Sequence, residues 1–347
     1  MYQDEYRDSR TTKSTETLFS VVPVGTCTYR HMSDDDVFHM NINTLEKGLV
    51  SREYPVFEAS KGNNLEFLVQ HINSSEEFKA FCAEQKKGGT RTRLYYNTLC
   101  QFTVRVPALK EQAQISQCLK KLDTLITLHQ RKHEKLVNIK KSMLDKMFPQ
   151  NGVSVPEIRF KGFTDPWEQR KFSELYEKVS RKNDLTYGKD DIISVANMYY
   201  KAESYITDEN YLLTYNVFEM GDIAFEGNKS KNFAHGRFVE NTIGNGIVSH
   251  VFDVFKPRMT NYDLQFWKYA INNERIMGPI LLRSTKASTM MTNLVADDFL
   301  QENFLIPCYE EQKKIGEFLN QLDTLITLHQ REHIKPILEV KRVKRNE

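Results

Sequence analysis

The segment Leu122-Asp-Thr-Leu-Ile-Thr-Leu-His-Gln130 decides how this chain is organised, because the same nine residues recur at 322–330. An arginine follows each copy, so ten residues repeat at an offset of 200 positions. A repeat of this length does not arise by chance in a chain of 347 residues. The chain is therefore a tandem duplication, and its halves have diverged around a constant segment.

The repeat continues in register on both sides of the nonapeptide. The first copy carries Pro107, Glu111, Gln112, Ile115, Leu119, His133 and Lys135, and the second carries Pro307, Glu311, Gln312, Ile315, Leu319, His333 and Lys335. Upstream the match is weaker, with Leu65–Phe67 resembling Leu264–Phe266. The duplicated unit is a variable part followed by a constant segment.

The constant segment has the pattern of a long helix. Ile115, Leu122, His129, Leu136 and Met143 follow a seven-residue spacing, and a proline at the start suits a first helical turn. We predict helices over 108–148 and 308–335. Pro149 and Gly152 should end the first helix, and Pro336 should break the second, because a proline inside a helix costs about 3 kcal/mol or more.

An apolar stripe on helices of this length needs a partner. We predict that the two helices pair as an antiparallel coiled coil, although each could instead pack only on its own domain. The histidines at 129 and 329 are expected to pack in the seam rather than bind a metal. The predicted seam consists of Ile115, Leu122, Leu125, Ile126, His129 and Leu136 with Ile315, Leu322, Leu325, Ile326 and His329.

The variable parts have a mixed α/β pattern, which gives the α+β fold class overall. In the second half we predict strands over 191–196, 222–225 and 247–255 and a helix over 264–272. Hydrophobic residues make up 40% of the chain and the formal net charge is +2. No apolar run reaches the ~18 residues that a membrane span needs. No two of the five cysteines have C-x-x-C spacing, so we expect a reduced, cytoplasmic protein.

The stretch Val155-Pro-Glu-Ile-Arg-Phe-Lys-Gly-Phe-Thr-Asp-Pro-Trp167 resembles the start of a target recognition domain in the specificity subunit of type I restriction–modification enzymes. The Pro307…Glu311-Gln312…Leu322-Asp-Thr-Leu-Ile segment resembles the conserved helix of that family. The resemblance implies a DNA-binding subunit that recognises a split target, with one half-site for each variable domain. It also implies double-stranded DNA, modification (methyltransferase) subunits and restriction (translocase–nuclease) subunits as partners, and no membrane.

The resemblance implies four segments. They are target recognition domain 1 (1–107), spacer helix 1 (108–150), target recognition domain 2 (151–307) and spacer helix 2 (308–347). In the second half Pro156 precedes Pro307 by 151 positions, whereas only 106 residues precede Pro107. We therefore expect the first domain to be truncated at its N-terminus.

The sequence carries no recognisable catalytic pattern. It lacks a phosphate-binding G-x-x-x-x-G-K-[ST] loop and the Asn-Pro-Pro-aromatic signature of an amino-methyltransferase. A loose nuclease pattern at Asp298, Glu311 and Lys313 is not kept in the first half. We expect a binding protein without catalysis, cofactor or metal. The alternative is a coiled-coil assembly or interaction protein that does not recognise DNA, or a silent truncated allele.

DNA binding requires cations for phosphates and hydrogen-bonding side chains for base edges. Three loop-like segments combine both, at 86–93, 226–237 and 283–289. Two adjacent glycines in the first segment allow close backbone approach. Each segment could instead be a solvated surface loop. The candidate DNA-binding residues are Lys86, Lys87, Thr90, Arg91, Arg93, Lys229, Lys231, Asn232, Arg237, Arg283, Thr285, Lys286 and Ser288.

Overall fold

The computed structural model describes the backbone of residues 7–12, 15–150, 152–201, 206, 208–287 and 291–343. Side chains are described for residues 19–150, 152–201, 206, 208–287 and 291–330. The chain divides into two compact units, Met1–Leu128 and His129–Glu347. Each unit is described by itself below as the first and the second unit.

The first unit is built from short antiparallel strands and small helices. Its strands form sheets in the orders β1-β2-β6, β5-β3-β7 and β4-β8. They are β1 (Arg7–Thr12), β2 (Thr15–Val22), β3 (Cys27–Thr28), β4 (Met32–Ser33), β5 (Asn41–Ile42), β6 (Gly48–Ser51), β7 (Val56–Phe57) and β8 (Thr92–Arg93). The short helices are α1 (Leu65–Ser74), α2 (Glu76–Glu84) and α3 (Tyr96–Leu99).

Helices α1 and α2 cover the core of the first unit. Asn64 and Ser75 cap their N-termini by accepting backbone N–H hydrogen bonds, which satisfies donors that a helix start leaves unpaired. Val69 of α1 and Phe78 of α2 are buried against Tyr29. The N-terminus of α1 also binds the long helix, because Asn64 N donates to Gln112 Oε1 at 2.9 Å.

The two predicted long helices are present, as α4 (Leu109–Lys146) and α9 (Tyr309–Val343). Each begins two residues after its proline, and the repeated glutamine fixes the start in the same way. Gln112 Nε2 donates to Pro107 O at 2.8 Å, and Gln312 Nε2 donates to Pro307 O at 3.1 Å. The predicted break at Pro336 is wrong, since α9 remains helical to Val343. A proline removes one helical hydrogen bond and bends a helix, but helix on both sides of it can persist.

The second unit contains a larger set of short elements. Its strands are β9 (Glu168–Lys171), β10 (Tyr176–Val179), β11 (Ile193–Ser194), β12 (Tyr199–Tyr200), β13 (Asn216–Phe218), β14 (Ile223–Glu226), β15 (Arg237–Glu240), β16 (Gly246–Val248), β17 (Val254–Pro257), β18 (Thr285–Ala287), β19 (Thr292–Leu294) and β20 (Asn303–Ile306). Its shorter helices are α5 (Phe172–Leu175), α6 (Leu264–Ala270), α7 (Glu274–Ser284) and α8 (Ala296–Gln301), with 3-10 turns at Lys189–Asp191 and Glu209–Thr214.

An antiparallel sheet in the order β10-β17-β14-β15 forms the centre of the second unit. The strands predicted over 191–196 and 222–225 correspond to β11 and β14, and the predicted helix over 264–272 is α6. The single strand predicted over 247–255 is wrong. It is two strands in different sheets, β16 paired with β13 and β17 paired with β10 and β14. A turn between Ser249 and Phe252 separates them and leaves Val251 exposed, so alternation of apolar residues misled the prediction.

Helix α6 packs closely on the start of α9 in the second unit. Asp263 caps α6 by accepting a hydrogen bond from Phe266 N at 2.7 Å. A Cβ at Gly316 would lie 2.6 Å from both Asp263 Oδ1 and Phe266 N. The close approach of α6 to α9 therefore requires glycine at this position. One turn earlier, Glu311 is fully buried and binds Arg159 through contacts of 2.7 and 2.8 Å.

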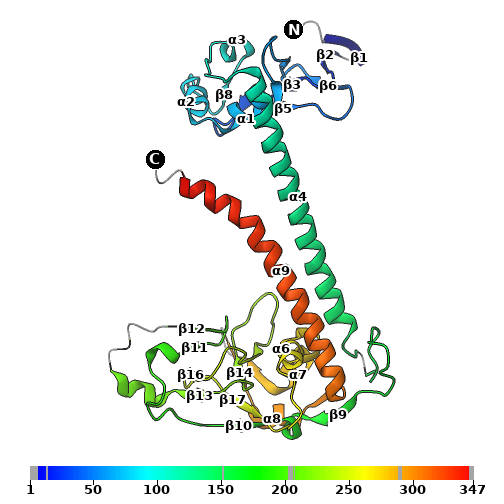
Figure 1. Cartoon of the computed structure of the whole chain (residues 1–347), viewed down its shortest axis with the longest axis vertical. Coiled ribbons are helices and arrows are strands. Elements are labelled where there is room, and N and C mark those ends of the chain that lie inside the picture. The colour runs from blue at the N-terminus through cyan, green and yellow to red at the C-terminus, as the bar shows by residue number, and fades with distance from the viewer. Residues whose placement is uncertain are drawn as a thin grey trace. The chain divides into compact units, whose positions relative to one another are not determined.

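Within the second unit, the C-terminal part of α4 lies antiparallel to α9 (Figure 1). His129 Nδ1 lies 3.2 Å from His329 Nδ1, and Lys140 Nζ lies 2.5 Å from Asp323 Oδ1. Positions thus rise along α4 as they fall along α9. Leu136, Ile139 and Met143 of α4 pack on the core that contains Ile315, Leu319 and Leu322 of α9.

Candidate nucleic-acid interface

The loop between β14 and β15 in the second unit has a fixed base. A Cβ at Gly227 would lie 2.2 Å from Thr292 O, and one at Gly236 would lie 2.6 Å from Glu226 O. Gly236 also has a φ of +80°, a conformation that favours glycine. These two glycines allow the β18–β19 hairpin to pack directly on the base of the loop.

Thr292 of β19 pairs with Ala287 of β18, which belongs to the segment 283–289, and it also binds the segment 226–237. Its backbone N–H donates to Gly227 O at 2.8 Å, and its hydroxyl donates to His235 O at 2.8 Å. Asn228 and Met291 form an antiparallel bridge beside it. The segments 226–237 and 283–289 are far apart in sequence, yet both contact β19.

Two predicted arginines of this surface lie in internal ion pairs. Arg237 binds Glu226 at 2.7 Å, donates to Ala196 O at 2.7 Å and lies 5.1 Å from the Phe233 ring. Arg283 makes two contacts with Glu302, at 2.8 and 2.5 Å. Both arginines therefore organise the protein surface, and their charges are partly compensated.

Other predicted residues of the second unit point outward. Lys229, Lys231, Asn232 and Lys286 are exposed. Thr285 is half-buried, and its hydroxyl donates to Leu281 O at 2.6 Å. Ser288 lies outside the described residues. The outward groups are ammonium and amide side chains, which suit phosphates and base edges respectively.

In the first unit, the predicted basic segment 86–93 faces an acidic loop that the sequence interpretation missed. Lys86 Nζ lies 3.2 Å from Asp36, and Arg91 Nε lies 2.7 Å from Asp34. The buried Thr92 hydroxyl also donates to Asp36. The run of three aspartates at 34–36 was the available signal in the sequence.

Hydrogen bonds hold the acidic loop in its charged form. The Thr92 hydroxyl, followed by Lys86, lowers the pKa of the Asp36 carboxyl, and Ser33 lowers that of Asp35. Lys87, Thr90 and Arg93 are exposed, and Gly88 and Gly89 have φ values of +65° and +94°. The outward cations of this segment are therefore Lys87 and Arg93, whereas Lys86 and Arg91 are paired.

The predicted seam residues have different environments. Ile315, Leu322 and His329 are buried, and the rings of His129 and His329 lie 5.4 Å apart. Exposed fractions are 43% for Leu122, 52% for Leu125 and 42% for Leu325. The half-buried seam residues are Ile115, Ile126, His129, Leu136 and Ile326.

A carboxyl group with a raised pKa lies inside the second unit. Burial raises the pKa of Glu240 well above its usual value. The Tyr262 hydroxyl donates to Glu240, and it lies 3.0 Å from the Tyr176 hydroxyl. Burial also raises the pKa of Asp222 to about 6, although Arg181 opposes this shift. Both groups are covered by protein, so they contribute to the interior rather than to the exposed loops.

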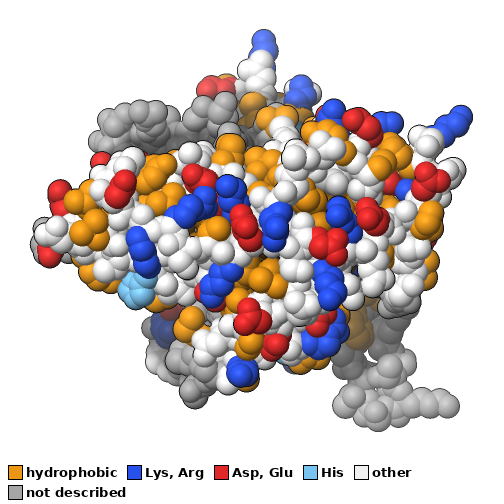
Figure 2. Space-filling view, turned by 90° about the horizontal axis from the view of Figure 1, so that it is seen from below, with side chains coloured by type: hydrophobic (Ala, Val, Ile, Leu, Met, Phe, Trp, Pro, Cys, Tyr) orange, Lys and Arg blue, Asp and Glu red, His pale blue; other side chains and the backbone are white. Residues whose placement is uncertain are grey.

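Charges on the visible surface are mixed rather than segregated. Figure 2 shows Lys and Arg side chains interspersed with acidic and apolar ones, without an unbroken basic area on that face. Within the described residues, no group of three or more His, Cys, Asp or Glu side chains could hold a metal ion. No described helix is long and apolar enough to cross a membrane.

Comparison with known families identifies the family of this chain. The model of the type I restriction modification DNA specificity domain matches residues 39–138 and 164–338, most of both halves. The chain belongs to this family. It is a DNA specificity subunit of a type I restriction–modification system, a recognition protein rather than a catalyst, and its partners are DNA and other subunits of that system.

Two solved structures of specificity subunits are similar to the chain, and the one with the higher TM-score supports the fold. The type I restriction–modification S subunit from M. genitalium matches with a TM-score of 0.52 at 13% identity, covering 93% of this chain and 82% of its own. The HsdS subunit from Thermoanaerobacter tengcongensis matches with a TM-score of 0.48 at 15% identity, covering 94% and 80%. No curated protein sequence matches the chain significantly. The M. genitalium match agrees with the predicted α+β fold of two recognition domains and long helices.

Proposed function

We propose that the chain recognises a DNA target in two parts, with one half-site for each unit, and directs methylation and restriction by partner subunits to it. The observation that supports this most is the position of Thr292, which pairs with Ala287 of the segment 283–289 and binds the loop 226–237 in the second unit. The joined surface exposes Lys231, Asn232 and Lys286. Lysine contacts to phosphate position a protein on DNA, and an amide can bind adenine through two hydrogen bonds.

The proposed recognition domains are residues 1–107 and 151–307, and the proposed spacer helices are 108–150 and 308–347. The helix α4 (Leu109–Lys146) joins the two domains along the chain. A helix of fixed length can set the distance between half-sites, because it rises by about 1.5 Å per residue. The spacer helices would therefore determine the gap in the target, and the loops would determine its bases.

We propose that the exposed leucines of α4 help to dock the modification subunits, which in turn recruit the restriction subunits. Leu119, Leu122, Leu125 and Leu128 are between 40% and 54% exposed. They recur every three residues on a helix, so each leucine is next to the following one, and the row winds about halfway around the helix. A contiguous apolar surface of this kind is typical of a protein–protein interface.

The test is to express the chain with modification subunits and sequence the methylated sites in the host DNA. A single split target is expected for the intact chain. Asn232→Ala should relax the preference at one position of one half-site by about 1–3 kcal/mol, whereas Lys286→Gln should weaken binding to all duplexes alike. Methylation without any sequence preference would contradict the proposal.

A further inference from the structure

The second unit contains a cation-lined pocket beside the loop 226–237. Its volume is about 720 Å³. The C-terminal part of α4, the helices α6 and α7, Asp323 of α9 and the loop residues Asn232 and Phe233 form its walls. Four cations line it, namely Lys140, Lys141, Lys268 and Arg275.

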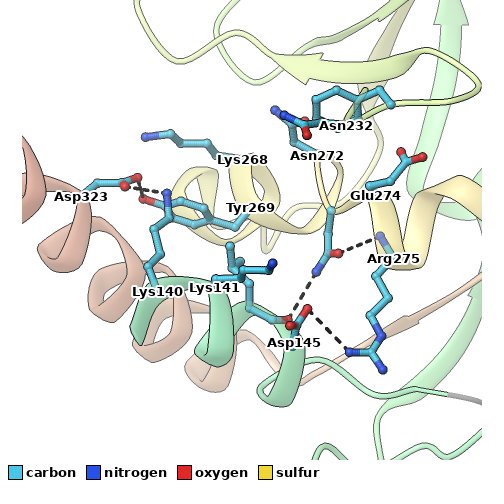
Figure 3. Close-up of a pocket in the computed structure, with 13 residues that line it drawn as sticks. Lys140, Lys141, Asp145, Asn232, Lys268, Tyr269, Asn272, Glu274, Arg275 and Asp323 are labelled. Carbon is cyan, nitrogen blue, oxygen red and sulfur yellow. Dashed lines mark hydrogen bonds and ion pairs between the residues drawn. The ribbon is translucent and has the colours of Figure 1, made fainter. Parts of the chain in front are cut away.

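Two of the four cations are compensated inside the pocket. Lys140 Nζ lies 2.5 Å from Asp323, whose other oxygen accepts a hydrogen bond from the Tyr269 hydroxyl at 2.6 Å. Arg275 lies 3.6 Å from Asp145 (Figure 3). The third carboxylate, Glu274, accepts a hydrogen bond from Ala234 N at 3.2 Å. Each carboxylate of the lining therefore has one of these contacts, and the second oxygen of Glu274 is buried without a hydrogen-bond partner.

Lys141 and Lys268 remain without a carboxylate partner among the described residues. Lys141 is exposed. Lys268 Nζ lies 5.2 Å from the centre of the Tyr269 ring, and Lys140 Nζ lies 5.1 Å from the same ring. Figure 3 shows Lys268, Lys140 and Asp323 around Tyr269. An ammonium that shares a ring with a second ammonium gains from a nearby anion.

Comparison with the first unit indicates that the fold does not require Lys268 and Tyr269. Leu65–Phe67 of α1 corresponds to Leu264–Phe266 of α6, so Val69 and Gln70 stand where the second unit has Lys268 and Tyr269. In the second unit α6 packs closely on α9, and in the first unit α1 contacts α4 through hydrogen bonds from Ser116 and Lys120 to Glu66. Lys268 is therefore an addition of the second unit, and an anionic ligand explains it better than helix packing does.

We propose that this pocket is a phosphate-binding subsite for DNA, in which Lys268 and Lys141 hold the backbone next to the bases that the loop 226–237 contacts. The inference rests on the proposed function. The shared wall formed by Asn232 and Phe233 favours DNA over an acidic protein segment, because any duplex at this loop brings its phosphates to the pocket rim. Phosphate contacts fix position without selecting sequence.

The experiment measures binding of the full chain, assembled with its modification subunits, to labelled target and random duplexes across a salt series. Log affinity falls as log salt concentration rises. Lys268→Gln and Lys141→Gln should each make this slope shallower by about 0.9. Near 0.15 M salt, loss of one such phosphate contact should weaken the affinity for DNA about fivefold. The loss should be equal on both duplexes. Lys268→Arg should retain the slope, and Lys161→Gln, an exposed lysine outside the pocket, should change nothing.

Other outcomes overturn the inference in distinguishable ways. Unchanged affinity and slope in both glutamine variants would exclude a phosphate contact. A changed base preference would assign the pocket to base recognition instead. Intact DNA binding with weakened subunit assembly would show that an acidic segment of a partner occupies it. If the unaltered complex did not distinguish target from random DNA, the proposed function would fail, and the inference with it.

Discussion

The duplication keeps residues whose environments have become different. Glu111 and Glu311 occupy equivalent positions, but Glu111 is exposed while Glu311 is fully buried against Arg159. Nη1 of Arg159 has no hydrogen-bond partner. The hydrogen bonds of this guanidinium are those that Nε and Nη2 donate to Glu311. Breaking a buried ion pair leaves an uncompensated charge in the interior.

Glu311→Gln should therefore destabilise the second unit by about 3 kcal/mol. Urea unfolding followed by tryptophan fluorescence measures this, because both tryptophans, Trp167 and Trp267, lie in the core of that unit. Glu310→Gln is the control on the same helical turn, since Glu310 is exposed and its pair with Lys313 is 3.8 Å long. That exposed pair should contribute less than about 1 kcal/mol. Equal losses in the two variants would contradict the assignment.

Glu240 should make the second unit less stable as pH rises. Burial raises its pKa above the usual 4.5, so the folded state holds a proton that the unfolded state releases above that pH. Stability should fall as pH increases from 4.5 through the raised value. Glu240→Gln does not titrate and can still accept a hydrogen bond from Tyr262. The variant should lose less stability over this range in urea titrations at several pH values, and a parallel pH profile would show that another group is responsible.

At the scale of elements, close helix packing depends on Gly316. Alanine there gains about 1 kcal/mol of helix propensity, but its Cβ would lie 2.6 Å from Asp263 Oδ1 and Phe266 N. Loss of the cap and overpacking together should give Gly316→Ala a net cost of about 1–3 kcal/mol. Gly278→Ala is the matched control, because its Cβ would meet only the flexible side chain of Glu274, at 3.2 Å or more. A stable Gly316→Ala protein would show that α6 can shift on α9.

The sequence could predict the elements that have a long period. The seven-residue spacing predicted both long helices, because it persists over many turns, and Pro107 and Pro307 predicted their starts. The strands β16 and β17 were merged because a turn of five residues between two buried strands leaves no clear break in an apolar pattern. Pro336 was predicted to end the helix because the helix propensity of a single residue does not account for the helical turns before and after it.

The candidate site could be predicted in position but not in detail. Composition selected the segments 86–93 and 226–237 as candidates, and their contact with DNA stays a prediction. Composition could not show that Arg91 binds Asp34, or that Arg237 binds Glu226, since partners distant in sequence are set by the fold. Lys268 was missed because a single lysine on a predicted helix has the pattern of an ordinary solvated face.

At the scale of the whole molecule, the repeat separates two tasks. The constant segments form α4 and α9, while the residues proposed to contact bases lie in the parts that diverged between the halves. The start of each long helix is fixed by the same bond from a glutamine to a proline carbonyl. Under the proposed function, a recognition domain could therefore be exchanged without changing how its neighbouring helix begins.

The same separation predicts that the gap and the bases of the target can be changed independently. Inserting four residues after Leu128 lengthens α4 by about 6 Å and by slightly more than one turn, so the face that the helix presents is nearly preserved. Methylation sequencing should then show the same half-sites with a longer gap between them. Inserting two residues instead turns the helix by about 200° and should abolish methylation of a split target. A four-residue insertion that altered the bases themselves would show that α4 takes part in sequence recognition rather than in setting the distance.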